Sequence, residues 1–231
     1  MHALILAAGR GERMRPLTDT VAKPLLPAAG RRLIEWQIEA LVRAGILDLV
    51  VNTAHLAEQI EAALGDGSRY GARIGYSREG TTAADALETL GGIVKALVQL
   101  GPQPFLAVSS DILTDFDYRQ LLPAAAAIER GQFDAHLVLV ENPPYHPLGD
   151  MGIAARPGGD VATCTGPRYT YANIGVLAPR LFRELAPVRA PLFPWLFEAV
   201  ERGRVSTQLW RGRWCNVGTP QDLAIVDRIW R

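Results

Sequence analysis

The sequence predicts an α/β fold with a mostly parallel central sheet, helices on both faces and a small antiparallel insertion. Two observations support this prediction. Through the first half of the chain, short apolar runs alternate with longer stretches of helical periodicity. The second half is less regular and contains short β-prone runs between proline-containing loops. Because strands separated by helices need crossover connections, they pair in parallel. With no composition break to mark a linker, we expect a single domain over residues 1–231.

The first half contains the clearest elements. The predicted strands are the apolar runs 3–7, 47–51, 72–76 and 105–108, with residues 134–140 as a fifth. The predicted helices repeat apolar residues every three or four positions over 33–44, 56–64 and 93–100. Ligands of such sheets bind beyond the carboxyl ends of the strands. The segments after Ala7, Val51 and Val108 are therefore expected to form a site.

The second half is predicted in less detail. Residues 169–177 have the pattern of a longer strand, and residues 191–202 that of a helix begun by proline. Residues 205–210 and 213–217 suggest a hairpin about Gly212. A closing helix is expected from Thr219 onward.

Composition excludes several classes of protein. A hydrophobic content of 48% with 21% charged residues excludes intrinsic disorder. Lys+Arg and Asp+Glu number 24 each, a balance that argues against nucleic acid or a membrane surface as partner. The sequence has no apolar run of membrane-spanning length and no signal-peptide pattern at its start. Cys164 and Cys215 make neither a disulfide framework nor a zinc site, so we expect a cytoplasmic protein. The oligomeric state is left open.

A glycine-rich turn, GRGERMRP, follows the first predicted strand at residues 9–16. It is not a dinucleotide fingerprint, because Met14 stands where a third glycine would, and no Gly-Lys-Ser/Thr completes a Walker loop. Two glycines spaced by one residue still allow backbone N–H groups to converge on an anion. Four cationic side chains accompany the turn: Arg10, Arg13, Arg15 and Lys23. The pattern indicates a polyphosphate ligand, with a solvated surface loop as the alternative.

Lysine is rare in this chain. Only Lys23 and Lys95 are lysines among 24 basic residues. Where arginine fills nearly every positive position, a retained lysine favours a need for a compact ammonium. We expect this for Lys23, whereas Lys95 is expected to be a solvated helix residue.

The motif Leu-Ala-Ala-Gly-x-Gly-x-Arg-Met-x-Pro-Leu-Thr at residues 6–18, followed by Lys-Pro-Leu at 23–25, resembles the signature of sugar-1-phosphate nucleotidyltransferases. The likeness continues to Val-Gly-Thr at 217–219 and covers essentially the whole chain. It implies a Rossmann-like nucleotidyltransferase fold and a Mg²⁺-dependent reaction. In that reaction a sugar 1-phosphate attacks the α-phosphorus of a nucleoside triphosphate and pyrophosphate leaves.

Residues 140–150 resemble one branch of that family. Val-Glu-Asn-Pro at 140–143, then His146, Gly149 and Asp150, are similar to uridylyltransferases that act on N-acetylmuramate 1-phosphate in cell-wall recycling. Enzymes for mannose or glucose 1-phosphate more often carry Glu-Lys-Pro at 141–143 and remain alternatives. So do transferases with other acceptors, such as phosphocholine.

The resemblance also implies site residues. Arg13, Lys23 and Asp111 would be catalytic, with Lys23 between the two reacting phosphates. Nucleotide binding would fall to Ala8, Gly9, Gly11, Glu12, Arg13, Arg15, Lys23, Glu79, Thr89, Gly91 and Ser109. Sugar binding would fall to Asn142, Asp150, Asn173 and Thr219. Asp111 and Asn216 would hold the Mg²⁺ ion.

Three positions depart from the family pattern. Asn216 stands where members usually carry a second metal-binding aspartate, and an amide supplies no charge. Leu90 replaces a glycine or alanine and is expected to crowd the base or ribose. Ser-Ser precedes Asp111 in place of Asn-Gly. These departures keep open a second hypothesis, a nucleotide-binding protein with weakened turnover.

Overall fold

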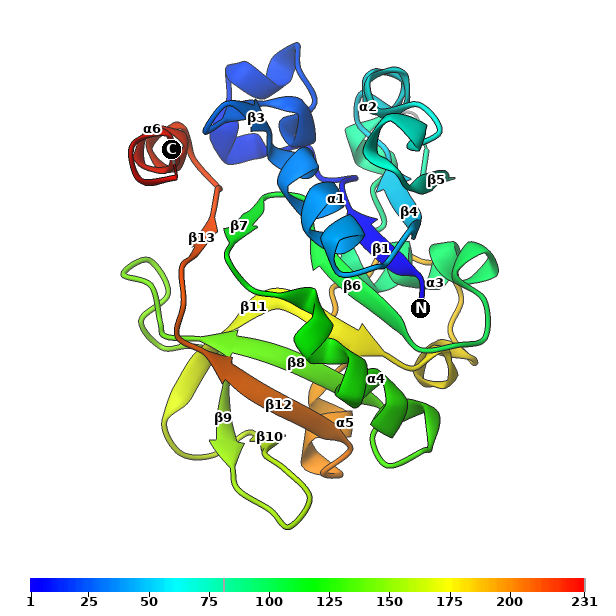
Figure 1. Ribbon diagram of the computed structural model, residues 1–231, viewed down its shortest axis with the longest axis vertical. Helices are drawn as coiled ribbons and strands as arrows, with labels where there is room; N and C mark the ends of the chain where they lie inside the picture. Colours follow the sequence, from blue (N-terminus) through cyan, green and yellow to red (C-terminus); the bar gives the residue numbers. More distant parts are fainter. Residues whose placement is uncertain (81, 231) are drawn as a thin grey trace.

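The computed structural model describes residues 1–80 and 82–230, and a large mixed sheet runs through its centre (Figure 1). In the described part of the chain the sheet has nine strands. In spatial order they are β5 (Arg73–Arg78), β4 (Asp48–Thr53), β1 (Ala3–Leu6), β6 (Phe105–Ser109), β11 (Arg168–Leu177), β8 (Ala135–Val140), β12 (Val205–Trp210), β10 (Val161–Thr163) and β9 (Met151–Ala154).

The strands β5, β4, β1 and β6 form a parallel half-sheet. Their connections contain α1 (Leu33–Arg43), α2 (Ala57–Leu64) and α3 (Glu88–Leu100). The alternation of strand and helix predicted for this half is confirmed. The carboxyl ends of β1, β4 and β6 consequently lie at one edge, where the site is expected.

The other half of the sheet is mostly antiparallel. β11 runs antiparallel to both β6 and β8, whereas β12 runs parallel to β8. β10 joins β12 to β9, and β9 pairs back onto β11, so these five strands close into a ring. The prediction of a mostly parallel sheet therefore holds for the first four strands and not for the remainder.

The predicted hairpin about Gly212 is wrong. β12 pairs with β8 along its whole length and with β10 only at Ser206, and the segment that follows does not return to it. That segment, β13 (Trp214–Asn216), pairs antiparallel with β7 (Ile112–Thr114) instead. Asn216 lies opposite Ile112 in this register. The pairing of β13 with β7 therefore brings Asn216 next to the segment that carries Asp111.

The remaining helices are α4 (Leu122–Glu129), α5 (Phe197–Glu201) and α6 (Pro220–Ile229). The predicted helix over 191–202 is wrong for its first half, because Pro191 and Pro194 donate no backbone hydrogen bond and Pro194 disfavours helical geometry at Phe193. The closing helix is confirmed as α6. A small ribbon pairs β2 (Pro27–Ala28) with β3 (Arg31–Arg32). Short 3₁₀ turns lie at Glu12–Met14, Leu17–Asp19, Lys23–Leu25, Ser68–Tyr70, Ala83–Asp85, Tyr118–Leu121 and Pro179–Phe182.

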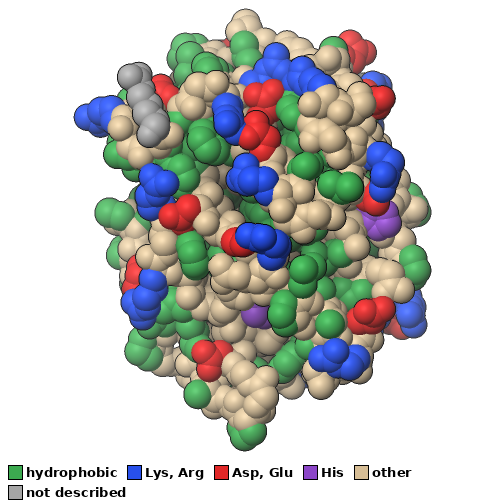
Figure 2. Space-filling view, viewed as in Figure 1, with side chains coloured by type: hydrophobic (Ala, Val, Ile, Leu, Met, Phe, Trp, Pro, Cys, Tyr) green, Lys and Arg blue, Asp and Glu red, His purple; other side chains and the backbone are tan. Residues whose placement is uncertain are grey.

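Helices cover both faces of the sheet. Ala3 and Ile5 of β1 pack in an apolar cluster with α1, α2 and α4, whereas Leu4 between them packs with α3 and α5. A third cluster joins α6 to the N-terminal loop through Met14, Val217 and Trp230. Among the described residues, no helix combines the length and apolar character needed to cross a membrane. Figure 2 shows basic and acidic side chains interspersed on one face of the molecule.

Candidate active site

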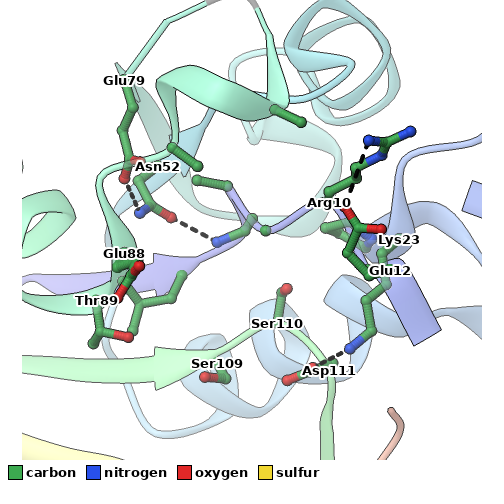
Figure 3. A pocket seen from close by; sticks show the side chains of 18 of the residues that line it. Arg10, Glu12, Lys23, Asn52, Glu79, Glu88, Thr89, Ser109, Ser110 and Asp111 are labelled. Carbon is green, nitrogen blue, oxygen red and sulfur yellow. Dashed lines mark hydrogen bonds and ion pairs between the residues drawn. The ribbon is translucent and has the colours of Figure 1, made fainter. Parts of the chain in front are cut away.

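A cavity of about 390 Å³ opens at the carboxyl ends of β1, β4 and β6 (Figure 3). Its lining comes from the glycine-rich turn after β1, from Asn52 at the end of β4, and from residues 109–111 after β6. The location is the one predicted from the strand order. We call this cavity, with its lining, the first cavity.

The glycine-rich turn is fixed by local hydrogen bonds. Gly11 adopts a φ of 71°, and its carbonyl accepts from the Met14 amide at 2.9 Å and from Thr18 Oγ1 at 2.9 Å. A Cβ at position 11 would lie 3.0 Å from Lys23 Cδ, so the lysine stem packs directly on the glycine. Met14 is fully buried and anchors the far side of the turn. These contacts place the backbone of the turn and the Lys23 side chain in the lining of the same cavity.

Asp111 is held at the turn between β6 and β7. The Ser110 amide donates to the Leu6 carbonyl at 3.0 Å, and the Asp111 carbonyl accepts from the Val217 amide at 2.9 Å. Its carboxylate forms an ion pair with the Lys23 ammonium through Oδ2. The two side chains are 21% and 12% exposed, so water screens this pair only partly. Lys23 and Asp111 therefore share one cavity, as predicted.

Other charges of the first cavity are also paired. Arg10 Nη1 lies 3.4 Å from Glu12 Oε1, and Arg189 Nε lies 3.0 Å from Glu88 Oε1. Together with Lys23 and Asp111, these pairs account for every cation that lines the cavity in the described residues. Any anion that binds here must replace carboxylates that already neutralise the cations.

Glu79 is the buried acid of the first cavity. Its carboxylate accepts from Asn52 Nδ2 and from the Leu87 amide, both at 2.6 Å, and burial raises its pKa. Asn52 Oδ1 in turn accepts from the Ala7 amide at 2.6 Å. The Lys95 ammonium donates to the Glu79 carbonyl at 3.3 Å, so Lys95 is not the solvated residue expected. The network ties β1, β4 and β5 together beneath the cavity.

The structure places most of the predicted nucleotide residues in the first cavity. These are Ala8, Gly9, Gly11, Glu12, Lys23, Glu79, Thr89 and Ser109, and the predicted metal ligand Asp111 lines the same cavity. Sequence reasoning missed Asn52, Glu88 and Arg189 as lining residues, and counted Arg10 only as a loop cation. Arg189 follows no motif and reaches the cavity from a loop of the second half. The polar residue at the end of β4 was a usable signal for Asn52.

Arg13, Arg15 and Gly91 do not line the first cavity. The Arg13 guanidinium lies against Gly218, where an added Cβ would be 2.8 Å from its Nη2. Arg15 Nε donates to Asp19 Oδ1 at 2.7 Å on the exposed side of the turn. A Cβ on Gly91 would lie 2.2 Å from the Val188 carbonyl oxygen, so this glycine permits close loop packing.

Leu90 does not crowd the first cavity. Its side chain is 6% exposed and packs in the apolar cluster with Leu4 and Val50. The helical periodicity of α3 turns Leu90 toward the sheet while Thr89 faces the cavity. The predicted clash with the base or ribose is therefore wrong.

A second cavity of about 340 Å³ adjoins the first, and Thr89 lines both. Besides Thr89, three predicted residues line it: Asp150, Asn173 and Asn216. Four aromatic residues contribute to its walls: Tyr145, Tyr171, Phe193 and Trp214. We call this the second cavity.

Asn173 occupies an irregular point of the second cavity. It has a φ of 57° within the register shift of β11 between Tyr171 and Gly175. The Ala172 carbonyl beside it accepts from Trp214 Nε1 at 3.0 Å, which stabilises the bulge. Asparagine tolerates this left-handed conformation better than most residues. Such strain directed into a cavity is typical of functional sites.

Asp150 organises the loop above the second cavity. Its Oδ2 accepts from the Tyr171 amide at 2.7 Å, and its Oδ1 lies 3.1 Å from His146 Nε2. Burial raises the pKa of Tyr171, so its hydroxyl stays neutral. His146, which shares this contact, was not among the predicted sugar-binding residues.

Asn142 and Thr219 line neither cavity. Asn142 Nδ2 donates to the carbonyls of Pro147 and Arg168, and its Oδ1 accepts from Thr170 Oγ1. Thr219 caps α6, where its hydroxyl donates to Asp222 Oδ2 at 2.8 Å. Both polar side chains are therefore used to hold loops, and the resemblance could not distinguish this from ligand contact.

A magnesium ion would find two suitable oxygen ligands here. Asn216 Oδ1 is buried and accepts no hydrogen bond within the described structure. It belongs to the strand segment paired with the one that follows Asp111. Mg²⁺ is commonly held by one or two protein oxygens together with phosphate oxygens and water. No group of three or more His, Cys, Asp or Glu residues that could hold a metal occurs among the described residues. The donor set thus fits Mg²⁺ bound together with a phosphate ligand.

Comparisons with known proteins identify the family of this chain. The family model described as "Nucleotidyl transferase" matches residues 2–161. The N-acetylmuramate alpha-1-phosphate uridylyltransferase of Neisseria meningitidis is 46% identical over 95% of this chain and 94% of its own. The enzyme of that name from Caulobacter vibrioides is 32% identical over 95% and 92%.

A solved structure supports the fold. It is that of a putative glucose-1-phosphate thymidylyltransferase from Bacillus anthracis, with a TM-score of 0.81 at 20% identity. The match covers 99% of this chain and 94% of the other. The family model and the two related uridylyltransferases show that the chain belongs to the sugar-1-phosphate nucleotidyltransferase family, and that it is a nucleotidyltransferase.

Proposed function

We propose that this protein transfers a uridylyl group from UTP to N-acetylmuramate 1-phosphate, giving the nucleotide sugar and pyrophosphate. The observation that carries the proposal is the first cavity, where a glycine turn, Lys23 and Asp111 meet at the strand ends. The two related uridylyltransferases, each matched over more than nine-tenths of its length, support this choice of substrates. A cytoplasmic role in cell-wall recycling would follow.

In this proposal the first cavity binds the nucleotide. Backbone amides of Ala8, Gly9 and Gly11 would contact the phosphates, and Arg10 would add charge from the same turn. Glu79 and Thr89 would meet the nucleoside. Lys23 would lie between the two reacting phosphates, where a compact ammonium can contact both. Arg13 would approach from the side of Gly218.

The second cavity would bind the sugar phosphate. Its aromatic walls suit the apolar face of a pyranose ring, and Asn173 offers an amide for hydroxyl groups. Thr89 lines both cavities, so acceptor and nucleotide would meet beside it. Asp150 would hold His146 and the backbone of Tyr171 in place.

The reaction needs positioning and charge stabilisation more than proton transfer. An anionic oxygen of the sugar phosphate forms a bond to the α-phosphorus, and the bond from that phosphorus to the pyrophosphate oxygen breaks. The attacking phosphate is already ionised near neutral pH, so no general base is required. Asp111 and Asn216 would hold Mg²⁺, which when bound supplies positive charge to the phosphate oxygens. Lys23 and the turn amides reduce repulsion between the two phosphates.

A turnover panel tests the proposal. The protein is incubated with Mg²⁺, each nucleoside triphosphate and a series of sugar 1-phosphates, and pyrophosphate release is measured. UTP with N-acetylmuramate 1-phosphate should give the highest kcat/KM. A preference for mannose or glucose 1-phosphate would overturn the assignment of the acceptor, whereas the assignment as a nucleotidyltransferase would stand.

A second candidate function rests on Asn216. Since its amide brings no charge to the metal position, the chain could bind nucleotide with weak turnover. Calorimetry that detects nucleotide binding, combined with no pyrophosphate from any pair in the panel, would favour this candidate. Pyrophosphate release at rates ordinary for enzymes would exclude it.

A further inference from the structure

The candidate metal position has one carboxylate, and a lysine neutralises it. Asp111 Oδ2 pairs with the Lys23 ammonium, and both side chains are mostly buried. Asn216 contributes an oxygen but no charge. The net charge of these three side chains is therefore zero, which gives a divalent cation little electrostatic reason to bind.

We propose that Lys23 excludes a divalent cation from Asp111 until a nucleoside triphosphate binds, so that metal and nucleotide enter the site together. The inference rests on the proposed function for the nature of the nucleotide. It assigns Lys23 two successive partners, first the Asp111 carboxylate and then the phosphates. It also makes metal affinity depend on nucleotide.

The exchange of partners is electrostatically balanced. A triphosphate carries several negative charges, so it competes for an ammonium that holds only one carboxylate. When Lys23 turns to the phosphates, the ion pair is replaced rather than lost. Asp111 is then an unpaired carboxylate in a partly buried site, where an unpaired charge is costly. A divalent cation that also binds phosphate oxygens offsets that cost.

The local structure lets Lys23 change partners without a large rearrangement. Its stem packs on Gly11, and the turn that supplies the backbone amides lines the same cavity as its ammonium. Asp111 is held in place by its backbone, through the Val217 amide at 2.9 Å. The lysine is thus the movable member of the pair, and a rotation of its side chain can carry the ammonium toward a bound phosphate.

A metal titration without nucleotide tests the proposal. Mn²⁺ serves as the probe, and free Mn²⁺ is measured by electron paramagnetic resonance for the wild-type protein and for Lys23→Met. Methionine keeps an unbranched stem against Gly11 but removes the charge. Lys23→Met should bind one Mn²⁺ with an affinity higher than wild type by about tenfold or more. Lys95→Met is the matched control, since Lys95 is the only other lysine, and it should bind as wild type does.

Two further variants fix the interpretation. Lys23→Gln replaces Lys23→Met if the latter fails to fold by circular dichroism. Adding Asp111→Asn to either variant should abolish the gained Mn²⁺ site. A non-hydrolysable UTP analogue should strengthen Mn²⁺ binding to the wild-type protein. The increase should exceed the Mn²⁺ that the analogue binds when it is free in solution. The same analogue should strengthen Mn²⁺ binding less for the Lys23 variant.

Equal Mn²⁺ affinity of wild type and Lys23→Met overturns the proposal, whether both bind or neither does. A gained site that survives Asp111→Asn also overturns it, because the metal is then held elsewhere. The titration uses no acceptor and measures no turnover. A failure of the proposed reaction in the substrate panel is therefore separate from a failure of this inference.

Discussion

The two cavities are lined by different kinds of chemical groups. The first lies at the ends of parallel strands and consists of backbone turns and paired charges, among them Lys23 with Asp111. The second is bounded by β11, β13 and the loop near Phe193, and four aromatic side chains contribute to its walls. Its charged or ionisable lining in the described residues, tyrosines aside, is His146 and Asp150. A ligand of the first cavity must take the place of carboxylates in existing ion pairs. A ligand of the second cavity must match the shape of the cavity.

The difference suggests a division of labour. Exchange of ion pairs favours binding of a nucleoside triphosphate whatever its base. The first cavity would therefore determine the rate of the transfer step. Shape and a few hydrogen bonds discriminate among neutral rings, so the second would set the acceptor. Variants that affect only one cavity should therefore separate rate from acceptor affinity.

The largest effect is expected for Asp111→Asn in the first cavity. Loss of the carboxylate removes the proposed charged ligand of Mg²⁺ and the partner of Lys23, so kcat should fall by about 1,000-fold or more. The KM of the sugar phosphate should change by no more than about twofold, because Asp111 does not line the second cavity. Steady-state kinetics with each substrate varied in turn measures both. Asp115→Asn, at an exposed residue near Arg213, is the control and should retain activity.

A large rise in acceptor KM in Asp111→Asn would contradict the separation of the two cavities. It would mean that the metal position also shapes the acceptor site.

The strand next to the second cavity should make the protein acid-sensitive. His136 of β8 is 6% exposed, with Nδ1 2.9 Å from Ser206 Oγ and Nε2 3.1 Å from Gln208 Oε1. Burial lowers the pKa of His136 to about 4 from 6.5. The unfolded chain then binds more protons between these values, so stability is complete above pH 6.5 and is lost as pH falls toward 4.

Between pH 7 and pH 5 this histidine should lower the free energy of unfolding by about 2 kcal/mol. Urea denaturation at both pH values measures the change, and His136→Gln should show a correspondingly smaller change. An unaltered pH dependence in that variant would show that other groups are responsible.

The first cavity was far easier to predict than the second. The glycine turn, Lys23 and Asp111 lie in contiguous motifs after buried strands, and the strand-end rule brings them together. Local sequence carries that information because parallel strands and their helices are consecutive. The ion pair between Lys23 and Asp111 was not predicted, since it depends on side chains 88 residues apart.

The second cavity depends on pairings that local sequence does not encode. The segment 213–217 has the pattern of a hairpin strand, yet β13 pairs with β7, which lies far from it in the sequence. Asn173 lies at a bulge that arises only when β11 meets both β6 and β8. Asn142 and Thr219 matched the family pattern, but their hydrogen bonds hold loops. Polar residue type alone could not separate these two uses.

Asn216 lines the second cavity, and its strand pairs with the one that follows Asp111 of the first, so changing it should sharpen the comparison. Asn216→Asp adds a second carboxylate beside Asp111, so the Mg²⁺ concentration that gives half-maximal activity should fall by about tenfold. Acceptor KM at saturating Mg²⁺ should stay within about twofold, because the two side chains have the same shape and the bound cation offsets the added charge. Initial rates over a Mg²⁺ series at saturating substrates measure the first quantity. An unchanged Mg²⁺ requirement would argue that Asn216 is not a metal ligand.

The smallest effect is expected in the second cavity, from Asn173→Gly. Glycine adopts the φ of 57° without strain, so this change removes the amide while keeping the bulge of β11. Loss of one hydrogen bond to a neutral hydroxyl costs about 1 kcal/mol, which is about fivefold in acceptor KM. The KM for UTP should be unchanged, since Asn173 does not line the first cavity. Asn173→Ala adds backbone strain to the same loss and should also lower thermal stability. If Asn173→Gly binds the acceptor as wild type does, the asparagine serves only the bulge, and the aromatic walls alone must account for acceptor binding.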